Sequence, residues 1–129
     1  MNIYYGSALC TDAAFIAKQD EILSTGNLDP THTDFAVLLD FIIFAPDEED
    51  AAYGVKQYFD SKKISIQRTM LQQVERKTLP PKETARLPQS PQAGMIRGLG
   101  GVVGVNVKNA ESIDNGFQLL FNSWMESES

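Results

Sequence analysis

The sequence predicts a small α+β domain, in which three or four mainly antiparallel strands form a sheet with helices packed on one face. Two observations predict this class. The chain has 129 residues, the length of a single domain with one hydrophobic core. Segments with the period of an amphipathic helix alternate along it with segments whose apolar residues follow the period of a strand. We therefore expect residues 1–129 to form one domain.

The first elements are predicted from caps, turn residues and β-branched residues. The run NIYY at residues 2–5 is a candidate for an extra edge strand. Residues 11–27 begin with a polar capping residue and reach Gly26, which favours a helix that ends there. Residues 35–44 are apolar except for one aspartate, rich in β-branched and aromatic side chains, and followed by Pro46. This pattern predicts a strand.

Four further elements follow. Residues 46–63 open with consecutive acidic side chains and end with two lysines, as the dipole of a helix prefers. Residues 64–74 and 101–108 alternate between apolar and polar side chains, so each should be a strand. Residues 109–127 form the clearest amphipathic helix. Its apolar stripe consists of Ile113, Phe117, Leu120, Phe121 and Trp124.

The central run of strand, helix, strand, strand and helix predicts a ferredoxin-like variant. If helices cover one face, strand alternation assigns that face to Phe35, Val37, Leu39, Phe41 and Ile43, with Ile64, Ile66 and the valines at 103, 105 and 107. The opposite face then holds Asp40 among Leu38, Ile42 and Phe44. There Asp40 needs no deep burial, and Lys108 on a neighbouring strand is a candidate partner for an ordinary salt bridge. A mixed apolar and charged face also predicts a protein–protein interface.

A basic loop is predicted at residues 75–99. It contains four prolines and no apolar period, and it is longer than compact domains usually tolerate without a function. Residues 73–98 carry five basic and two acidic side chains, a net charge of +3, which leaves −9 on the rest of the chain. The loop is either a solvated excursion or a segment that docks on an acidic surface. In the second case Arg76, Lys77, Lys82 and Arg86 should contact the partner.

Composition and motifs exclude several kinds of function. A net charge of −6 disfavours nucleic-acid binding by bulk charge, and no apolar run is long enough to cross a membrane. The single histidine, His32, excludes metal centres built on paired histidines, and its turn context favours an exposed side chain. The glycines at 98–101 lack the spacing and the following helix of a phosphate loop. We therefore expect no catalytic residue, metal or cofactor.

Residues 20–63 resemble the opening of the regulator of ribonuclease activity B family. The shared pattern is a short helix ending in a glycine-containing turn, a strand with an aromatic near its end, and a helix opened by acidic residues. The resemblance implies a ferredoxin-like, acidic, cytoplasmic protein that binds and inhibits an RNA-degrading enzyme. It implies no particular binding residue in this chain.

We therefore predict a non-enzymatic cytoplasmic module that binds another protein, as an inhibitor or as an immunity- or phage-type antagonist. We also expect it to self-associate through the uncovered face of its sheet. Two alternatives remain. One is a small-molecule-binding or enzymatic domain with a pocket between loop 75–99 and the sheet. A pocket that combined Asp40 with Arg68, Arg76 or Arg97 would favour it. The other alternative is a structural subunit of a larger assembly.

Overall fold

The computed structural model describes residues 1–11, 35–79 and 81–127. The predicted helix at 11–27 therefore lies outside the described residues except for its first residue, and His32 lies outside them as well. The α+β class and the small antiparallel sheet are confirmed. The elements are β1 (Asn2–Cys10), β2 (Phe35–Ala45), α3 (Glu48–Ser61), β3 (Ile66–Val74), the 3₁₀ turn η1 (Arg76–Thr78), α4 (Pro81–Arg86), β4 (Ile96–Asn106) and α5 (Ala110–Ser127).

The sheet has the order β3-β1-β2-β4, and every neighbouring pair is antiparallel. Strands β2 and β3, joined through α3, therefore run parallel with β1 between them, which is the split unit of ferredoxin-like folds. The prediction of an edge strand at 2–5 is wrong, because β1 is an inner strand. Its residues from Ile3 to Cys10 are all buried, as expected for a strand covered on both faces.

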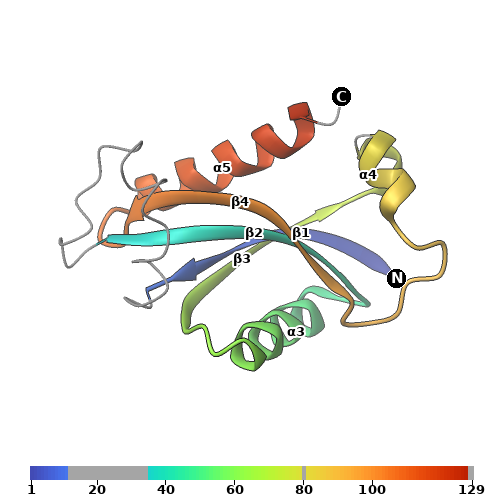
Figure 1. Cartoon of the computed structure of the whole chain (residues 1–129), viewed down its shortest axis with the longest axis horizontal. Coiled ribbons are helices and arrows are strands. Elements are labelled where there is room, and N and C mark those ends of the chain that lie inside the picture. The colour runs from blue at the N-terminus through green and yellow to red at the C-terminus, as the bar shows by residue number, and fades with distance from the viewer. Residues whose placement is uncertain (12–34, 80, 128–129) are drawn as a thin grey trace.

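The prediction that the helices share one face is also wrong. Helix α5 covers one face of the sheet and α3 covers the other, as Figure 1 shows. The sheet therefore separates two apolar cores. The α5 core contains Tyr5, Leu38, Ile42, Phe117 and Trp124, together with Ile3, Leu9, Ala36, Phe44, Leu79, Leu87, Val105, Ile113 and Leu120. The α3 core contains Tyr4, Ala8, Phe41, Ile43, Ala45, Ala51, Val55 and Phe59.

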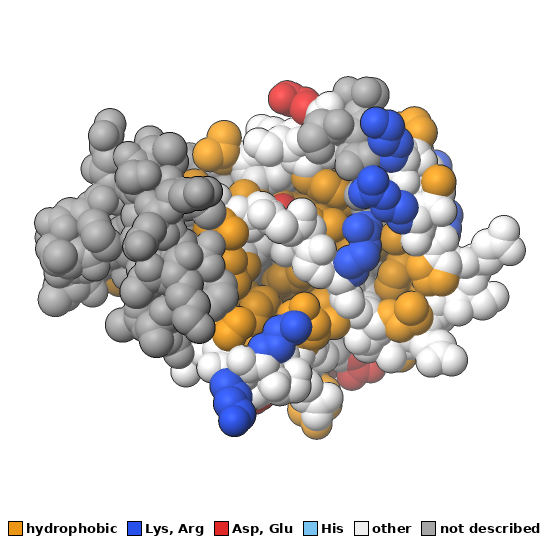
Figure 2. All heavy atoms as spheres, viewed as in Figure 1, with side chains coloured by type: hydrophobic (Ala, Val, Ile, Leu, Met, Phe, Trp, Pro, Cys, Tyr) orange, Lys and Arg blue, Asp and Glu red, His pale blue; other side chains and the backbone are white. Residues whose placement is uncertain are grey.

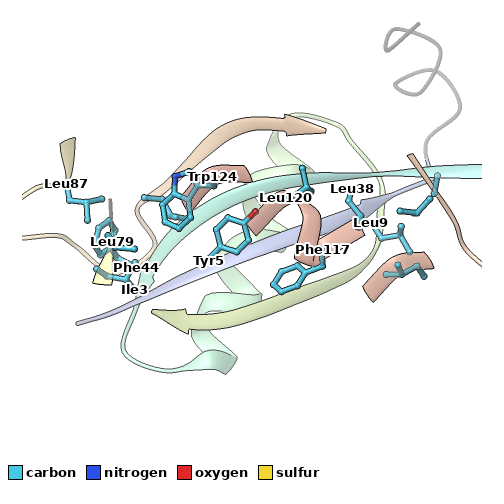
Figure 3. Close-up of a cluster of buried hydrophobic side chains, with 14 residues drawn as sticks. Ile3, Tyr5, Leu9, Leu38, Phe44, Leu79, Leu87, Phe117, Leu120 and Trp124 are labelled. Carbon is cyan, nitrogen blue, oxygen red and sulfur yellow. The ribbon is translucent and has the colours of Figure 1, made fainter. Parts of the chain in front are cut away.

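Both helices form where their sequence patterns predict them. Asp47 caps α3, because its carboxylate accepts a hydrogen bond of 2.8 Å from the amide of Asp50. The acidic first turn is exposed, which agrees with a solvated helix start. In α5 the predicted stripe is buried except for Phe121, which is partly buried, and Tyr5 lies against the stripe. Figure 3 shows the Tyr5 ring between Trp124 and Phe117, and its stacking distance to Trp124 is 5.0 Å.

A bulge changes the expected alternation of β3. Leu9 pairs with Arg68 whereas Cys10 pairs with Ile66, so one extra residue is inserted in β3. Ile66 consequently packs in the α3 core and Met70 in the α5 core, although simple alternation placed them on one face. The valines at 103, 105 and 107 do share a face, but their register with β2 places them with Leu38 in the α5 core rather than with Phe41.

The segment predicted as a loop at 75–99 is more ordered than its composition suggested. It contains η1 and α4, and its last residues already belong to β4. Leu79 and Leu87 are buried against the α5 core, where Figure 3 shows them near Ile3 and Phe44. The guanidinium of Arg76 donates a hydrogen bond of 2.8 Å to the carbonyl of Pro88, which closes the segment upon itself.

Candidate functional site

Asp40 is a buried carboxylate with two hydrogen bonds. Only 6% of its surface is exposed. The hydroxyl of Tyr5 donates to its Oδ2 at 3.1 Å, and the amide of Gly101 donates to its Oδ1 at 2.7 Å. The expectation that Asp40 faces solvent opposite the helices is wrong, because α5 covers that face. The expected salt bridge between Asp40 and Lys108 is also not formed. The register pairs Phe35 with Asn106, so Lys108 lies beyond the far end of β2.

The Gly101 amide reaches Asp40 because β4 bulges at this point. Leu39 pairs with Val102 and Phe41 with Gly98, so three residues of β4 lie opposite Asp40 alone. Two glycines make this bulge feasible. Gly100 has a φ of +82°, a left-handed conformation that favours glycine. A Cβ on Gly101 would lie 2.7 Å from Oδ2 of Asp40, so the carboxylate occupies the space that a side chain would need.

The surroundings of Asp40 favour its neutral form. Burial raises the pKa of Asp40 above its ordinary value, and the hydrogen bonds from Gly101 and Tyr5 offset part of that effect. Burial and the nearby carboxylate also raise the pKa of Tyr5, so its phenol stays protonated and remains a donor. Ser7 lies opposite Asp40 in the sheet, and its buried hydroxyl has no hydrogen-bond partner among the described residues. The hydrogen bonds of the cluster therefore link Asp40 of β2 to β1 and to β4.

Three more predicted contact residues are buried with Asp40. Leu38, Ile42 and Phe44 lie within the α5 core and are at most 4% exposed. They were expected to form an uncovered apolar face for a partner or a second copy, and this expectation is wrong because α5 lies over them. The physical reason is that β2 is an inner strand between two helical layers. Its nearly continuous apolar sequence is typical of strands buried on both faces.

A small pocket opens beside the bulge on the α3 side of the sheet. It has a volume of about 210 Å³, and apolar side chains form most of its wall. Lys62 is the basic residue in the wall of this pocket, and its amino nitrogen lies 5.0 Å from the centre of the Tyr58 ring. The lining residues are Leu39, Asp40, Phe41, Tyr58, Phe59, Lys62, Ile64, Gly98, Gly100, Gly101 and Val102. We call this the bulge pocket.

A second pocket lies between the 75–95 segment and the sheet. Its volume is about 490 Å³, and Arg76 and Glu75 contribute to its wall with Gln73, Phe44 and Asn2. This is the position at which a small-molecule-binding or enzymatic domain was expected to have its pocket. However, Asp40 lines the bulge pocket instead, so neither of these two pockets has the combination of Asp40 with an arginine that would favour that alternative.

The two edges of the sheet differ in chemistry. Strand β3 exposes Gln67, Arg68, Gln72 and Gln73, polar side chains of the kind that protect an edge. Strand β4 has the sequence IRGLGGVVGVN, with four glycines and one charged residue. No other strand in the described part of the chain pairs with its outer side. β4 is therefore the less protected edge.

Hydrogen bonds at its two ends show which β4 amides point outward. The amide of Phe44 donates to the carbonyl of Met95, and the amide of Asn106 donates to the hydroxyl of Ser112 rather than to β2. Because inward and outward groups alternate along an antiparallel strand, the amides of Gly98 and Val102 point away from β2. Both residues also line the bulge pocket.

The predicted basic residues lie on the surface around α4, except for one. Lys77, Lys82 and Arg86 are exposed, and Lys77 lies 3.2 Å from Glu75. Arg76 is partly buried and holds Pro88, so it supports the segment. Figure 2 shows Lys and Arg side chains gathered around exposed hydrophobic side chains on the viewed face, with few Asp and Glu side chains in sight.

Sequence reasoning missed the bulge pocket and the β4 edge. The run GLGG at 98–101 was the available signal, because closely spaced glycines in a strand often mark a bulge. The described residues contain no cluster of three potential metal ligands. None of the helices in the described ranges is long and apolar enough to cross a membrane. No protein-family model, curated protein or solved structure matches the chain.

Proposed function

We propose that the protein is a non-enzymatic binding module that pairs the outer edge of β4 with an extended segment of another protein. The observation that carries the proposal is the outer edge of β4, which pairs with no other strand among the described residues and has outward amides at Gly98 and Val102. Main-chain pairing at a free edge is a common mode of peptide recognition, in which the added strand extends the sheet. Exposed polar side chains protect the β3 edge, which explains why the partner would pair with β4 and not with β3.

The chemistry of Asp40 supports a binding role over a catalytic one. Each carboxylate oxygen already accepts a hydrogen bond, and the buried Ser7 hydroxyl makes none with a described residue. A general acid or base needs access to a proton of the substrate. Asp40 instead uses its oxygens to hold the β4 bulge and the Tyr5 hydroxyl, so its hydrogen bonds serve the shape of the binding edge.

The partner is proposed to be a cytoplasmic protein, which matches a chain with one buried cysteine. Inhibition of a ribonuclease, which the resemblance of residues 20–63 implies, is one form that this binding would take. The exposed Lys77, Lys82 and Arg86 would strengthen attraction to an acidic surface of the partner. Self-association by pairing two β4 edges is the homomeric form of the same proposal.

The test is affinity capture from the native host with wild-type protein and two matched variants. Gly98→Pro removes an outward amide hydrogen, whereas Gly98→Ala keeps it, and a Cβ at Gly98 meets no atom within 4 Å. A specific partner should be retained by the wild type and by Gly98→Ala. It should fall about fivefold or more with Gly98→Pro, since one hydrogen bond contributes about 1 kcal/mol.

A second pair, Val102→Pro and Val102→Ala, repeats the comparison on the other side of the bulge. Thermal melts establish which variants remain folded before capture. Equal retention by both folded proline variants and by the wild type would contradict edge pairing.

The 490 Å³ pocket beside Arg76 supports a second candidate, a small-molecule-binding domain. An arginine at a pocket between an ordered segment and the sheet is suited to an anionic ligand. Thermal-shift screening with anionic metabolites would test it. A ligand that stabilises the wild type but not Gln89→Trp, which narrows that pocket, would favour this candidate.

A further inference from the structure

We infer that the bulge pocket receives one apolar side chain of the strand that pairs with β4, and that an acidic residue of the same strand meets Lys62. The inference rests on the proposed edge pairing and names the chemistry of the partner segment. The occupant is therefore an extended stretch that combines an aliphatic or aromatic residue with neighbouring Asp or Glu residues.

The position of the pocket carries the first part of the inference. It opens beside Gly98 and Val102, two residues whose amides point outward, so a strand paired there passes over its mouth. Alternate side chains of an added strand point to the same face of the sheet. One of them must therefore point toward the α3 side, where Leu39, Phe59 and Ile64 form an apolar wall.

The size of the pocket limits its occupant to one side chain. A cavity of about 150 Å³ lined by apolar residues is sufficient for a benzene molecule. At about 210 Å³ the bulge pocket is suited to a leucine, isoleucine, methionine or phenylalanine side chain. Its apolar wall makes burial of such a side chain favourable, since the gain is proportional to the apolar area removed from water.

The charge around the pocket carries the second part. Lys62 is exposed at its rim, and β4 itself contains Arg97 and no Asp or Glu. Figure 2 shows basic side chains beside hydrophobic ones on the viewed face. A strand with carboxylates complements this surface, whereas a second β4 brings Arg97 and no acidic side chain. Charge complementarity therefore favours a different, acidic protein segment over a second copy of this chain.

The bulge explains why the pocket exists at this place. Asp40 holds Gly101 through a 2.7 Å hydrogen bond, and the three residues opposite it displace β4 from a regular ladder. Three glycines in and beside the bulge line the pocket, and they have no side chains that would fill it: Gly98, Gly100 and Gly101. Asp40 thus acts as a positioning residue, which fixes the opening without contacting the main chain of the partner.

The experiment selects binders from a phage-displayed library of random heptapeptides on the full-length protein. Selected peptides are then synthesised, and their affinity is measured by fluorescence anisotropy with wild type, Gly98→Trp and Lys62→Glu. Gly98→Trp places a large side chain at the mouth of the pocket, where a Cβ meets open space. Lys56→Glu is the matched control, because Lys56 is exposed on α3, the helix that ends just before Lys62, and does not line the pocket.

We expect selected peptides to share one large apolar residue with Asp or Glu nearby. Replacing that apolar residue by Ala, or introducing Gly98→Trp, should weaken binding about tenfold or more, as burial of one such side chain predicts. Lys62→Glu should weaken binding and reduce its salt dependence, and Lys56→Glu should have a smaller effect on both. NMR shifts should centre on β4 and the end of α3.

Two results would overturn the inference. Peptides that bind at β4 by the NMR shifts but lose nothing on Ala replacement or with Gly98→Trp would leave edge pairing intact and remove the pocket from it. A wild-type protein that sediments as a dimer, in which Gly98→Pro gives monomers and no selected peptide competes, would make a second copy the occupant. Failure of edge pairing itself would instead appear as equal capture by the proline variants described above.

Discussion

The carboxylate of Asp40 accepts a 2.7 Å hydrogen bond from the amide of Gly101, a residue 61 positions later in the chain. This bond links the inner strand β2 to the bulge of the edge strand β4. The hydroxyl of Tyr5 completes the arrangement at the other carboxylate oxygen. Asp40 therefore joins three strands, because Tyr5 belongs to β1. The bulge in β4 therefore explains why the apolar strand β2 contains one carboxylate, because Asp40 accepts the hydrogen bond of the displaced Gly101 amide.

Replacing Asp40 by Leu should destabilise the fold by about 2–4 kcal/mol, because the buried Tyr5 hydroxyl and the partly buried Gly101 amide lose their acceptor. Asp40→Asn keeps a carbonyl oxygen and should lose less than half as much. Urea unfolding followed by tryptophan fluorescence measures both values. A leucine variant as stable as the wild type would show that the apolar gain compensates for the lost hydrogen bonds.

Protonation of Asp40 should stabilise the protein. Because burial raises its pKa in the folded state, the folded protein binds this proton more tightly than the unfolded chain does. The contribution is fully present below the ordinary carboxyl pKa of 3.8 and is lost as pH rises through the higher folded value. The free energy of unfolding of wild type minus that of Asp40→Asn should therefore fall as pH rises across this window. A rising difference would mean that the hydrogen bonds outweigh burial.

Gly101→Ala should destabilise the protein by about 1–3 kcal/mol, the usual range for overpacking. Its Cβ would lie 2.7 and 2.8 Å from the two oxygens of a carboxylate that is fixed by hydrogen bonds. Gly98→Ala is the matched control, since its Cβ meets no atom within 4 Å. Thermal melts of the two variants should differ clearly. Equal melting temperatures would show that the bulge can move without cost.

Trp124→Ala should cost about 3–5 kcal/mol, as removal of a buried large aromatic side chain usually does. The indole is 6% exposed and lies parallel to the Tyr5 ring, with an interplanar angle of 16°. Leu119→Ala on the same helix should have little effect, because Leu119 is 56% exposed. Chemical denaturation monitored by circular dichroism tests both. An unchanged midpoint for Trp124→Ala would exclude α5 from the core.

Serine at Lys77, Lys82 and Arg86 should weaken partner binding and make the remaining affinity less sensitive to salt. Arg76 is kept, because its hydrogen bond to Pro88 supports the segment. The affinity of the wild type and of the triple variant for the captured partner should be measured at two salt concentrations. Unchanged affinity and salt dependence would make the basic segment a spacer. The stability of the triple variant should equal that of the wild type, since the three side chains are exposed.

The parts of the fold that depend on local pattern were predictable. The stripe of α5, the acidic cap of α3 and the alternation in β4 each follow from side-chain spacing and helix-end chemistry. The NIYY run was expected at an edge, however, because these four residues do not show that small and apolar side chains continue to Cys10. That longer run is the mark of a strand covered on both faces.

The candidate site was less predictable, because it depends on register. A bulge in β4 and another in β3 each change which residues share a face. The alternation of apolar and polar residues in one strand does not reveal such an insertion, because the register depends on the partner strand. Asp40 was correctly singled out as the unusual residue of β2. Its burial follows from the side of the sheet that α5 covers, which is decided by tertiary packing and not by the local sequence.

The inner position of β1 has a consequence for the order of assembly. Both of its neighbours, β2 and β3, come later in the chain, and the nearer one begins at Phe35. Every hydrogen bond that β1 makes within the sheet therefore closes a long loop, and such non-local pairing slows folding. During synthesis the apolar β1 emerges from the ribosome before either neighbour exists. The nascent chain therefore exposes a strand that is buried from Ile3 to Cys10 in the folded sheet until its partner strands have been synthesised.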